Sequence, residues 1–501
     1  MMASRKRQFW LVVGVALVSL LGWVALAAKN GVIGFPLDDA WIHQTYARSL
    51  ASGQGWTYFP GQPSAGATAP LWVLLLVPGY WLGGSPWCWV LFLGLLSIVA
   101  AALLAFAIWP YLSEQGGWWR VAAGALIALE WHLLWAALSG METLLIAVLS
   151  LVVMAALLRL SHKPVLAGNG WRWLVLGALV GVGIWVRPEA VTLFGPVGFV
   201  AVLLPAESHK KRFWRFGAAV IGLAALFGPY LAFNRWLAGA WWPNTFFAKQ
   251  AEYAVTRQIP LLVRLLRQPL PLLAGAGALL LIGFLAFGWL SLRERRWAEL
   301  SGVLWVLGYL GLFAIRLPVT YQHGRYIIPV LPVLALWGLA GFAAFATKES
   351  SSMVRWMLSR VWGVVMAILL LAFWWIGGQS YQADVEFING EMVKTAKWLN
   401  QHTEPDDVIA AHDIGAIGYF TQREIIDLAG LISPDVIPFI RDETRLAAHL
   451  EAECPAYLVT FPDWYPLLVE DLSLIYQTDS ALTRSLGHTN MAVYSWELCL
   501  P

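Results

Sequence analysis

Two adjacent aspartates, Asp38 and Asp39, follow a long apolar run and precede a segment with helical character. A carboxylate there can accept a proton in catalysis, or it can cap the following helix by accepting an amide hydrogen bond. The next turns present His43, Tyr46 and Arg48, and a Gly- and Pro-rich stretch with many aromatic residues comes after them. Long ordered loops of this kind usually carry function. We therefore treat the aspartate pair as a candidate site.

The composition indicates that these residues lie at a membrane. Of the 501 residues, 59% are hydrophobic, only 13% are charged, and 31 are tryptophan. This is too little charge to cover a soluble protein of the same length, and tryptophan favours the membrane–water interface. Apolar runs of about 20 residues, each long enough to cross about 30 Å of hydrocarbon, recur to about residue 377. The sequence predicts a polytopic α-helical membrane protein.

The charge distribution divides the chain near residue 378. From Gly378 to the end, 6 basic and 19 acidic residues give a net charge of −13, and the remainder of the chain carries +16. We expect a membrane domain over residues 1–377 and an acidic soluble domain over residues 378–501. An acidic domain argues against nucleic acid as a partner.

Short basic loops orient the predicted spans. The loops rich in Lys and Arg are 161–172, 207–215, 292–296 and 347–355. Placing them in the cytoplasm with the basic N-terminus requires eleven spans, and puts the aspartate pair and the acidic domain outside. The expected spans are 9–28, 87–109, 119–138, 141–160, 172–186, 188–205, 213–235, 270–291, 298–316, 326–347 and 355–377. The first is expected to be a retained anchor rather than a cleaved signal peptide. Residues 70–82, in the first outer loop at about 29–86, are too few to span and predict an interfacial helix.

The acidic domain has the pattern of an α/β fold. A helical pattern at 387–401 is followed by strand candidates at 408–411, 424–428, 456–460 and 491–496. This alternation predicts a small, mostly parallel sheet. The turn HDIGAIG lacks the GxGxxG spacing and is weak evidence for nucleotide binding. The three cysteines, Cys88, Cys454 and Cys499, form no metal motif, and a pairing of Cys454 with Cys499 stays open.

Several segments, in the same order, resemble the membrane-embedded GT-C glycosyltransferases. They are LDDAWIHQTYARSLASGQGWTYFPG with AGATAPLW, SGMET (139–143), VRPEA (186–190), PNTFFAK (243–249), GRYIIPVLP (324–332) and HDIGAIGYFTQREIIDLAGLISPDV (412–436). The resemblance covers nearly the whole chain and points to the bacterial branch that includes mycobacterial terminal arabinofuranosyltransferases. It implies a GT-C fold with about eleven transmembrane helices and an extracytoplasmic α/β domain, in the bacterial cytoplasmic membrane.

The resemblance also implies an activity. In such enzymes an acidic residue of the first outer loop is the general base that deprotonates an acceptor hydroxyl for in-line displacement at the anomeric carbon. We expect a hexosyl- or pentosyltransferase that uses a polyprenyl-phosphate-linked sugar, inverts the anomeric configuration and acts on a glycan, lipid or protein. We favour Asp38 as base, with Asp39 orienting it, capping the helix or repelling it. A second acidic role falls to Glu142, for which a dipole-favoured glutamate at a helix start is the alternative.

The donor phosphate requires cations at the outer leaflet. Basic residues beside the outer ends of spans are less expected from the positive-inside bias. We expect Arg325 and Lys249 to contact the phosphate, ahead of Arg187 and Arg48, with snorkelling to headgroups as the alternative. The other expected substrate-binding residues are His43, Tyr46, Asn244 and Glu130. Glu130 lies inside an apolar run, where an acid is either functional or buried, protonated and satisfied.

Two other classes of protein remain open. A transporter or lipid flippase explains the many spans and Glu130, but it explains poorly the outer domain and the long first loop, and the sequence has no matching halves with broken helices. A binding or scaffolding protein would act through its outer domain. Convergence of the first-loop carboxylates, Glu142 and the outer cations on one cavity would favour the enzyme. His43 and His323 could join a metal site, but no spacing demands it. GT-C enzymes that use monosaccharide donors do not generally need a catalytic metal, so the resemblance implies no metal or other cofactor.

Overall fold

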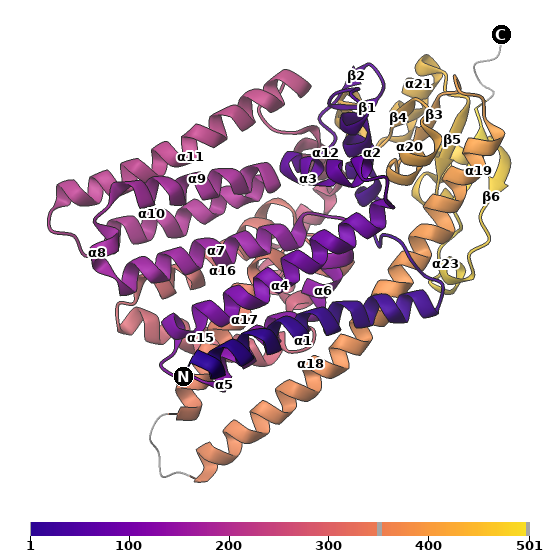
Figure 1. Cartoon of the computed structure of the whole chain (residues 1–501). Helices are drawn as coiled ribbons and strands as arrows, with labels where there is room; N and C mark the ends of the chain where they lie inside the picture. Colours follow the sequence, from indigo (N-terminus) through magenta and orange to yellow (C-terminus); the bar gives the residue numbers. More distant parts are fainter. Residues whose placement is uncertain (1, 348–352, 497–501) are drawn as a thin grey trace.

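Long apolar helices make up most of the chain in the computed structural model, which describes residues 2–347 and 353–496. The long helices of this region are α1 (Met2–Lys29), α4 (Pro86–Leu112), α5 (Trp118–Leu129), α6 (Trp131–Leu138), α7 (Thr143–His162), α9 (Gly170–Val186), α10 (Phe194–Leu203), α11 (His209–Ala238), α15 (Gly277–Arg293), α16 (Trp297–Arg316), α17 (Leu331–Thr347) and α18 (Met353–Ile388). Short helical turns join some of them: α8 (Pro164–Ala167), η1 (Pro188–Leu193), η3 (Gln322–Gly324) and η4 (Ile328–Val330). The C-terminal domain lies beyond one end of these helices, and the N-terminus lies at the other (Figure 1).

Every predicted span falls on a helix or on a broken helix. Within the described residues, seven helices are long and apolar enough to cross a membrane, or up to nine if each bent pair is one span. The bent pairs are α5 with α6, at 51°, and Leu261–Leu273 with Gly277–Arg293, at 116°. The predicted spans 172–186 and 188–205 coincide with shorter apolar helices. The fold class is confirmed, and the count of eleven spans stays a prediction.

Glycines set how closely some of these helices pack. A Cβ added to Gly177 of α9 would lie 1.9 Å from Ala219 O of α11, and one added to Gly222 of α11 would lie 1.9 Å from Leu174 O of α9. Small residues let helix backbones approach in this way in membrane proteins, where packing rather than hydrophobicity holds helices together. Substituting either glycine must therefore separate α9 from α11.

The first outer loop is folded rather than extended. It holds α2 (Asp39–Ala51), a hairpin of β1 (Thr57–Phe59) and β2 (Gln62–Pro63), and α3 (Pro70–Trp81), which confirms a helix at the predicted place. Most side chains of α2 are buried, because the helix packs against α3 on one side and against the C-terminal domain on another. Trp72 Nε1 donates to Gly140 O at 2.8 Å, which ties the loop to the SGMET turn.

A second segment, also predicted to lie on the outer side, connects α11 to α15. It holds α12 (Asn244–Glu252), η2 (Ala254–Gln258), α13 (Leu261–Arg267) and α14 (Leu270–Leu273). Figure 1 shows α12 beside α2 and α3, to the left of the C-terminal domain. Two outer segments that are far apart in the sequence therefore meet over the ends of the membrane helices.

The C-terminal domain is a five-stranded mixed sheet with short helices. The strands are β3 (Ile409–Ala411), β4 (Ile425–Asp427), β5 (Tyr457–Thr460), β6 (Ser473–Gln477) and β7 (Ala492–Ser495), in the order β4-β3-β5-β7-β6. Ile409 pairs with Ile425 and with Tyr457 in parallel, whereas β7 is antiparallel to both β5 and β6. The expectation of a mostly parallel sheet is corrected to a mixed one, because the exposed edge strand β6 was not recognised. The short helices are α20 (Gly415–Thr421), η6 (Pro434–Phe439), α21 (Glu443–Glu453), η7 (Pro462–Trp464), α22 (Pro466–Val469) and α23 (Ala481–Ser485).

One continuous helical path joins the membrane helices to this domain. The predicted boundary near residue 378 falls inside α18, which continues through a π turn at Asn389–Val393 into α19 (Lys394–His402). Glu391, fully buried in this turn, accepts hydrogen bonds from Asn490 Nδ2 at 2.7 Å and Met491 N at 2.9 Å. The turn is thereby fixed to the sheet. Cys499, and with it the open pairing with Cys454, lies outside the described residues, as does part of the basic loop 347–355.

Candidate active site

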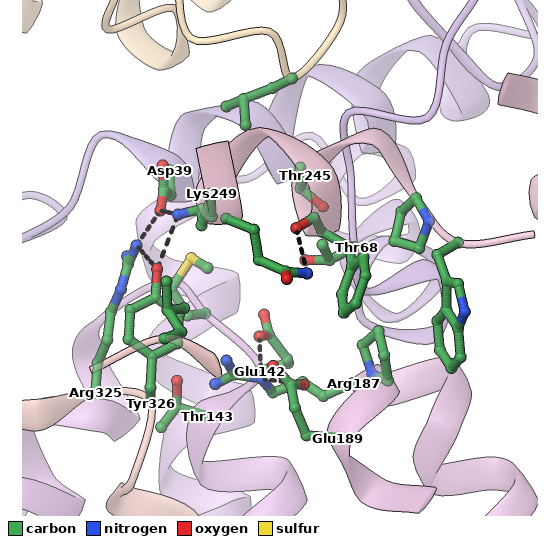
Figure 2. A pocket seen from close by; sticks show the side chains of 18 of the residues that line it. Asp39, Thr68, Glu142, Thr143, Arg187, Glu189, Thr245, Lys249, Arg325 and Tyr326 are labelled. Carbon is green, nitrogen blue, oxygen red and sulfur yellow. Dashed lines mark hydrogen bonds and ion pairs between the residues drawn. The ribbon is translucent and has the colours of Figure 1, made fainter. Parts of the chain in front are cut away.

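A cavity of about 310 Å³ lies where the first outer loop, α12 and the outer ends of the membrane helices meet (Figure 2). Its polar lining residues are Asp39, His43, Thr68, Glu142, Thr143, Arg187, Glu189, Thr245, Lys249, Gln250, Arg316, Arg325 and Tyr326. Part of its wall is apolar, from Trp242, Phe246, Leu312, Phe313 and Leu317. The cavity therefore has charged groups beside an apolar wall, and this combination suits a ligand with a polar head and an apolar tail.

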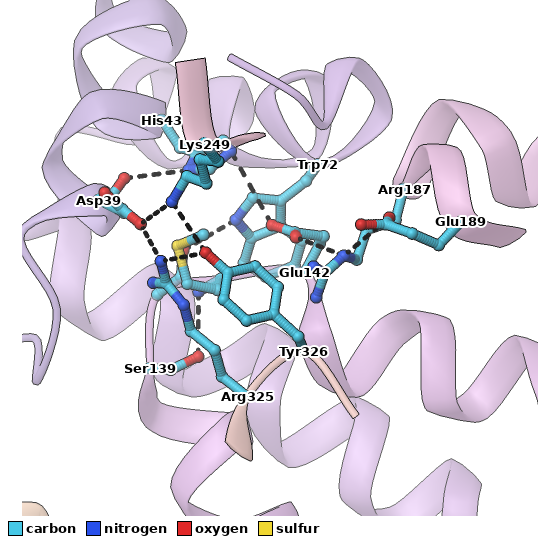
Figure 3. Close-up of polar contacts among 12 residues, drawn as sticks. Asp39, His43, Trp72, Ser139, Glu142, Arg187, Glu189, Lys249, Arg325 and Tyr326 are labelled. Atoms are coloured by element: carbon cyan, nitrogen blue, oxygen red, sulfur yellow. Dashed lines mark hydrogen bonds and ion pairs between the residues drawn. The ribbon is translucent and has the colours of Figure 1, made fainter. Parts of the chain in front are cut away.

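Asp39, the first residue of α2, lies in this cavity between two cations. Its Oδ2 is 2.6 Å from Arg325 Nη2 and 3.6 Å from Lys249 Nζ (Figure 3). Tyr326 Oη accepts from Lys249 Nζ at 2.9 Å and from Arg325 Nη2 at 3.0 Å. Burial alone raises the pKa of the Asp39 carboxyl, but Lys249 and Arg325 outweigh burial and lower it below its ordinary range. Asp39 is therefore held ionised, with both cations as partners.

Tyr326 is the centre of a cluster of cations. Arg325, Arg187 and Lys249 lie 4.9, 5.5 and 5.6 Å from the centroid of its ring. Arg325 is only 5% exposed, and its Nε and Nη1 have no hydrogen-bond partner among the described residues. Buried guanidinium donors without partners are costly unless a ligand satisfies them, and a planar guanidinium fits phosphate oxygens two at a time.

Glu142 lies on the other side of the cavity. Its Oε1 is 3.4 Å from Arg187 Nε, which is also 3.4 Å from Glu189 Oε2, and its Oε2 is 3.9 Å from His43 Nε2. Glu142 precedes α7, but its side chain makes no capping hydrogen bond within the described part of the chain. It is turned into the cavity instead, which favours a functional role over a simple helix-start glutamate.

The SGMET turn fixes this orientation of Glu142. Gly140 has φ +76°, and a Cβ there would lie 2.5 Å from Ala40 Cβ of α2 and 3.0 Å from Phe35. Only glycine combines this backbone conformation with so close an approach. The turn is therefore pressed against the start of α2, which brings Glu142 to the same cavity as Asp39.

Asp38 does not line the cavity. Its Oδ2 accepts from Gly415 N at 2.6 Å and its Oδ1 from Ala416 N at 2.8 Å, so it caps α20 of the C-terminal domain rather than α2. Gly415 is required there, since a Cβ would lie 2.0 Å from Asp38 O. The sequence favoured Asp38 as base with Asp39 as its neighbour; the structure places Asp39 at the cavity instead, because the turn into α2 points the two side chains in different directions.

The other expected substrate-binding residues divide into two groups. His43, Arg187, Lys249 and Arg325 line the cavity with Asp39 and Glu142. Four lie outside its lining: Arg48, Tyr46, Asn244 and Glu130. Arg48 donates to Tyr419 O at 2.6 Å, and Tyr46 Oη accepts from Gly66 N at 3.0 Å, so both hold the first loop together or to the C-terminal domain. Glu130 caps α6 at the bend after α5. Arg48, Tyr46 and Glu130 therefore have structural contacts outside the cavity lining, and the expected donor contacts of all four residues stay predictions.

Sequence reasoning did not single out Tyr326 and Glu189. Both belong to quoted motifs, GRYIIPVLP and VRPEA, and each lies next to or near an expected cation, Arg325 or Arg187. Their position beside these cations in the motifs was the sequence feature that could have identified them as site residues. Among residues 2–347 and 353–496 no group of three or more His, Cys, Asp or Glu is placed to hold a metal ion, and a metal-free reaction stays a prediction.

Solved structures with the same fold extend over nearly the whole chain. ArnT from Cupriavidus metallidurans, bound to undecaprenyl phosphate, is 16% identical with a TM-score of 0.59, covering 98% of each chain. The oligosaccharyltransferase AglB from Archaeoglobus fulgidus, in complex with an inhibitory peptide and a dolichol-phosphate, is 13% identical with a TM-score of 0.54, over 91% of this chain and 70% of that one. Arabinofuranosyltransferase AftD from Mycobacteria is 18% identical with a TM-score of 0.55, over 97% and 41%.

Sequence comparison is less informative. A family described as a domain of unknown function (DUF8728) matches residues 374–494, which begins close to the predicted boundary at residue 378. No curated protein matches. The structural likeness confirms the expected fold: the chain has the fold of the GT-C glycosyltransferases, a class of polytopic membrane proteins.

Proposed function

We propose that the chain is a glycosyltransferase that moves a sugar from a polyprenyl-phosphate donor to an acceptor hydroxyl outside the cytoplasm. The observation that carries this proposal is the cavity in which Asp39 lies between the buried cations Arg325 and Lys249, beside an apolar wall. The lipid carrier is supported by the undecaprenyl phosphate and the dolichol-phosphate bound to proteins of the same fold.

Arg325 and Lys249 bind the donor phosphate. Two donors of Arg325 are buried without partners among the described residues, so phosphate oxygens can accept hydrogen bonds from them. Lys249 adds a point charge 2.9 Å from the hydroxyl of Tyr326. The apolar residues Leu312 and Phe313 line the same cavity and contact the first units of the polyprenyl chain.

Asp39 is the general base. The acceptor oxygen attacks the anomeric carbon from the side opposite the phosphate, and its proton passes to the Asp39 carboxylate. The bond between the anomeric carbon and the phosphate oxygen breaks, and its electron pair leaves with polyprenyl phosphate. A single displacement of this kind inverts the anomeric configuration. The reaction needs no oxidant, reductant or further reactant.

Donor binding prepares Asp39 for this role. In the free protein its pKa is lowered mainly by Lys249 and Arg325, against the effect of burial, and a carboxylate of low pKa is a weak base. A bound phosphate competes with Asp39 for both cations, since it offers them more negative charge. When the cations turn to the phosphate, burial is no longer offset and the pKa of Asp39 rises. Proton transfer is thereby coupled to the presence of donor.

Binding of polyprenyl phosphate to the purified chain in nanodiscs tests the phosphate site. Arg325→Ala and Lys249→Ala each remove a charge-assisted contact, so each should weaken binding by about 10- to 100-fold. Arg267→Ala is the matched control, because Arg267 is an exposed outer arginine on α13 that does not line the cavity. Unchanged affinity in both variants would contradict the proposed phosphate site. Movement of a sugar-lipid across vesicles without sugar transfer would instead favour the flippase.

A further inference from the structure

His43 and Glu142 face one another across the cavity without a hydrogen bond between them. His43 is 3% exposed and Glu142 is 2% exposed, and both line the cavity. His43 Nε2 and Glu142 Oε2 are 3.9 Å apart, and neither atom has a hydrogen-bond partner in the part of the chain that the structure describes (Figure 3). Buried polar atoms are nearly always satisfied by protein, water or ligand, so this pair marks a place where a partner binds.

The tautomer of His43 defines what that partner must supply. His43 Nδ1 lies 3.1 Å from the backbone carbonyl oxygen of Asp39. A carbonyl oxygen only accepts, so Nδ1 carries the hydrogen, and in the neutral imidazole Nε2 presents a lone pair. Glu142 Oε2 is also an acceptor, and Arg187 is engaged with the other oxygen, Oε1, at 3.4 Å. Two hydrogen-bond acceptors therefore face the same space, and a bound ligand must supply two hydrogen-bond donors to satisfy them.

We infer that His43 and Glu142 bind two neighbouring hydroxyls of the donor sugar, one O–H donating to Nε2 and the other to Oε2. This assignment rests on the proposed function. A single hydroxyl has one hydrogen and leaves the second acceptor without a partner. Adjacent hydroxyls of a furanose or pyranose ring carry two hydrogens at a spacing that suits two acceptors 3.9 Å apart. The substrate class is thus a sugar with a free vicinal diol.

The position of the pair assigns the diol to the donor rather than to the acceptor. Arg187, which holds Glu142, and Lys249, which binds the phosphate, lie 5.5 and 5.6 Å from the centroid of the Tyr326 ring. Figure 2 shows Glu142 and Arg187 on one side of the cavity and Lys249 on the other. The sugar is bonded directly to the phosphate, so its ring lies beside Tyr326 with hydroxyls in reach of Glu142.

The geometry of the pair is fixed in advance, which makes it selective. His43 is held by the Asp39 carbonyl within α2, and Glu142 by the SGMET turn, where Trp72 Nε1 donates to Gly140 O at 2.8 Å. A rigid site built to accept hydroxyl hydrogens strongly rejects a ligand that lacks them, because its own buried acceptors are left unpaired. Removing either hydroxyl from the sugar should therefore reduce the binding affinity by more than the lost contact area alone would.

Glu142→Gln is the substitution that tests this inference. The glutamine carbonyl oxygen keeps the position facing Arg187, and its NH₂ group then donates toward His43 Nε2 and closes the gap between the two acceptors. The side chain keeps its size, so the cavity keeps its shape. His43→Asn is a second, independent variant, since it removes Nε2 and keeps an amide near the Asp39 carbonyl.

The measurement is the affinity of the full chain in nanodiscs for three kinds of lipid. These are polyprenyl phosphate, the same lipid carrying one of a panel of pentoses and hexoses, and each glycosylated lipid with one hydroxyl of the diol removed. The unsubstituted chain should bind one glycosylated lipid at least about 10-fold more tightly than its deoxy analogue. Glu142→Gln and His43→Asn should lose that difference and bind bare polyprenyl phosphate as before.

Glu189→Gln is the matched control. It alters the other carboxylate that contacts Arg187, at 3.4 Å. The variant should therefore still bind the glycosylated lipid more tightly than its deoxy analogue, even if its affinity for both lipids is lower. Persistence of that difference in Glu142→Gln and His43→Asn overturns the inference, as does an equal loss of affinity for bare polyprenyl phosphate. Failure of the unsubstituted chain to bind polyprenyl phosphate at all instead overturns the proposed function.

Discussion

Asp38 and Asp39 are neighbours in the sequence with opposite electrostatic environments. Asp39 lies between Lys249 and Arg325, which lower its pKa against the effect of burial. The pKa of Asp38 is raised well above its ordinary range, first by burial and then by the negative charge of Asp413, although two backbone amides favour the carboxylate. Environments that separate the pKa values of two acids commonly separate their roles. We assign the reaction to Asp39 and the docking of the C-terminal domain to Asp38.

The residue scale also shows where prediction from sequence ended. The types of residue were enough to find Asp39, Glu142, Arg325 and Lys249, because outer acids and cations in an apolar chain have few structural uses. The motif favoured Asp38 as base, but it did not show that Asp39 is the aspartate that lines the cavity. That placement depends on Gly415, 377 residues further along the chain, and no local pattern records such a contact.

At the scale of elements, α20 holds the first outer loop in place. Asp38 accepts from both Gly415 N and Ala416 N, and Tyr58 Oη donates to Ile414 O at 2.6 Å. Arg48 reaches across to Tyr419 O. These contacts join the start of α2, and with it Asp39, to a helix of the C-terminal domain. The domain therefore positions Asp39, although its described residues contribute only Leu431 to the cavity wall.

The contact of Asp38 with α20 predicts how stability depends on pH. Burial raises the pKa of both Asp38 and Asp413 in the folded state; the charge of Asp413 raises that of Asp38 further, and the charges of Asp39 and Glu252 raise that of Asp413. A raised pKa means that the folded state binds more protons than the unfolded state, so stability is greatest below the unfolded pKa of about 4. It is then lost as pH rises through the folded values. The melting temperature of the chain in nanodiscs should therefore fall from about pH 5 to pH 8.

Asp38→Asn should flatten this dependence, since asparagine does not titrate. Asp471→Asn changes an exposed acid of the same domain and should follow the unsubstituted chain. An equal pH slope in Asp38→Asn and the unsubstituted chain, or a melting temperature that rises with pH, would remove the proposed role of this contact.

Helices and strands were predicted well where a local sequence pattern was enough. Long apolar runs located the helices, and the alternation of helix-like and strand-like segments in the acidic domain located four of the five strands. The bend between α5 and α6 was not predicted, because Glu130 was considered as an intramembrane acid rather than as a cap that starts a new helix. Strand β6 was missed; it is an edge strand whose apolar residues Leu474 and Ile475 are exposed rather than buried. Both features depend on neighbours in space rather than on sequence pattern.

At the scale of the whole molecule, the cavity lies at the junction of two parts that are firmly joined. α18 passes from the membrane helices into the C-terminal domain without a linker. Arg441 Nε, in the C-terminal domain, donates to Glu252 O at 3.0 Å at the end of α12, which carries Lys249. In the proposed function, the lipid-linked donor and an aqueous acceptor meet at this junction.

This arrangement predicts the sidedness of the protein. In Figure 1, α8 and the N-terminus lie far from the C-terminal domain, as expected if the basic loops face the cytoplasm and the domain lies outside. In a cysteine-free background, an impermeant thiol reagent should label Leu486→Cys in intact cells, because Leu486 is exposed. It should label Lys210→Cys, in the basic loop 207–215, only after the membrane is permeabilised. Labelling of both positions in intact cells would contradict the topology.

The central claim is that Asp39 takes the proton of the acceptor, and sugar transfer by two variants tests it most directly. The rate is measured as release of polyprenyl phosphate from a polyprenyl-phosphate sugar in the presence of cell-envelope glycans, with donor affinity measured beside it. Asp39→Asn should lower kcat by about 10²- to 10⁴-fold, the usual contribution of general-base catalysis, while donor still binds. Asp38→Asn should lower kcat far less at neutral pH. Near-normal transfer by Asp39→Asn, with transfer abolished in Asp38→Asn, would contradict the account and return the role of base to Asp38.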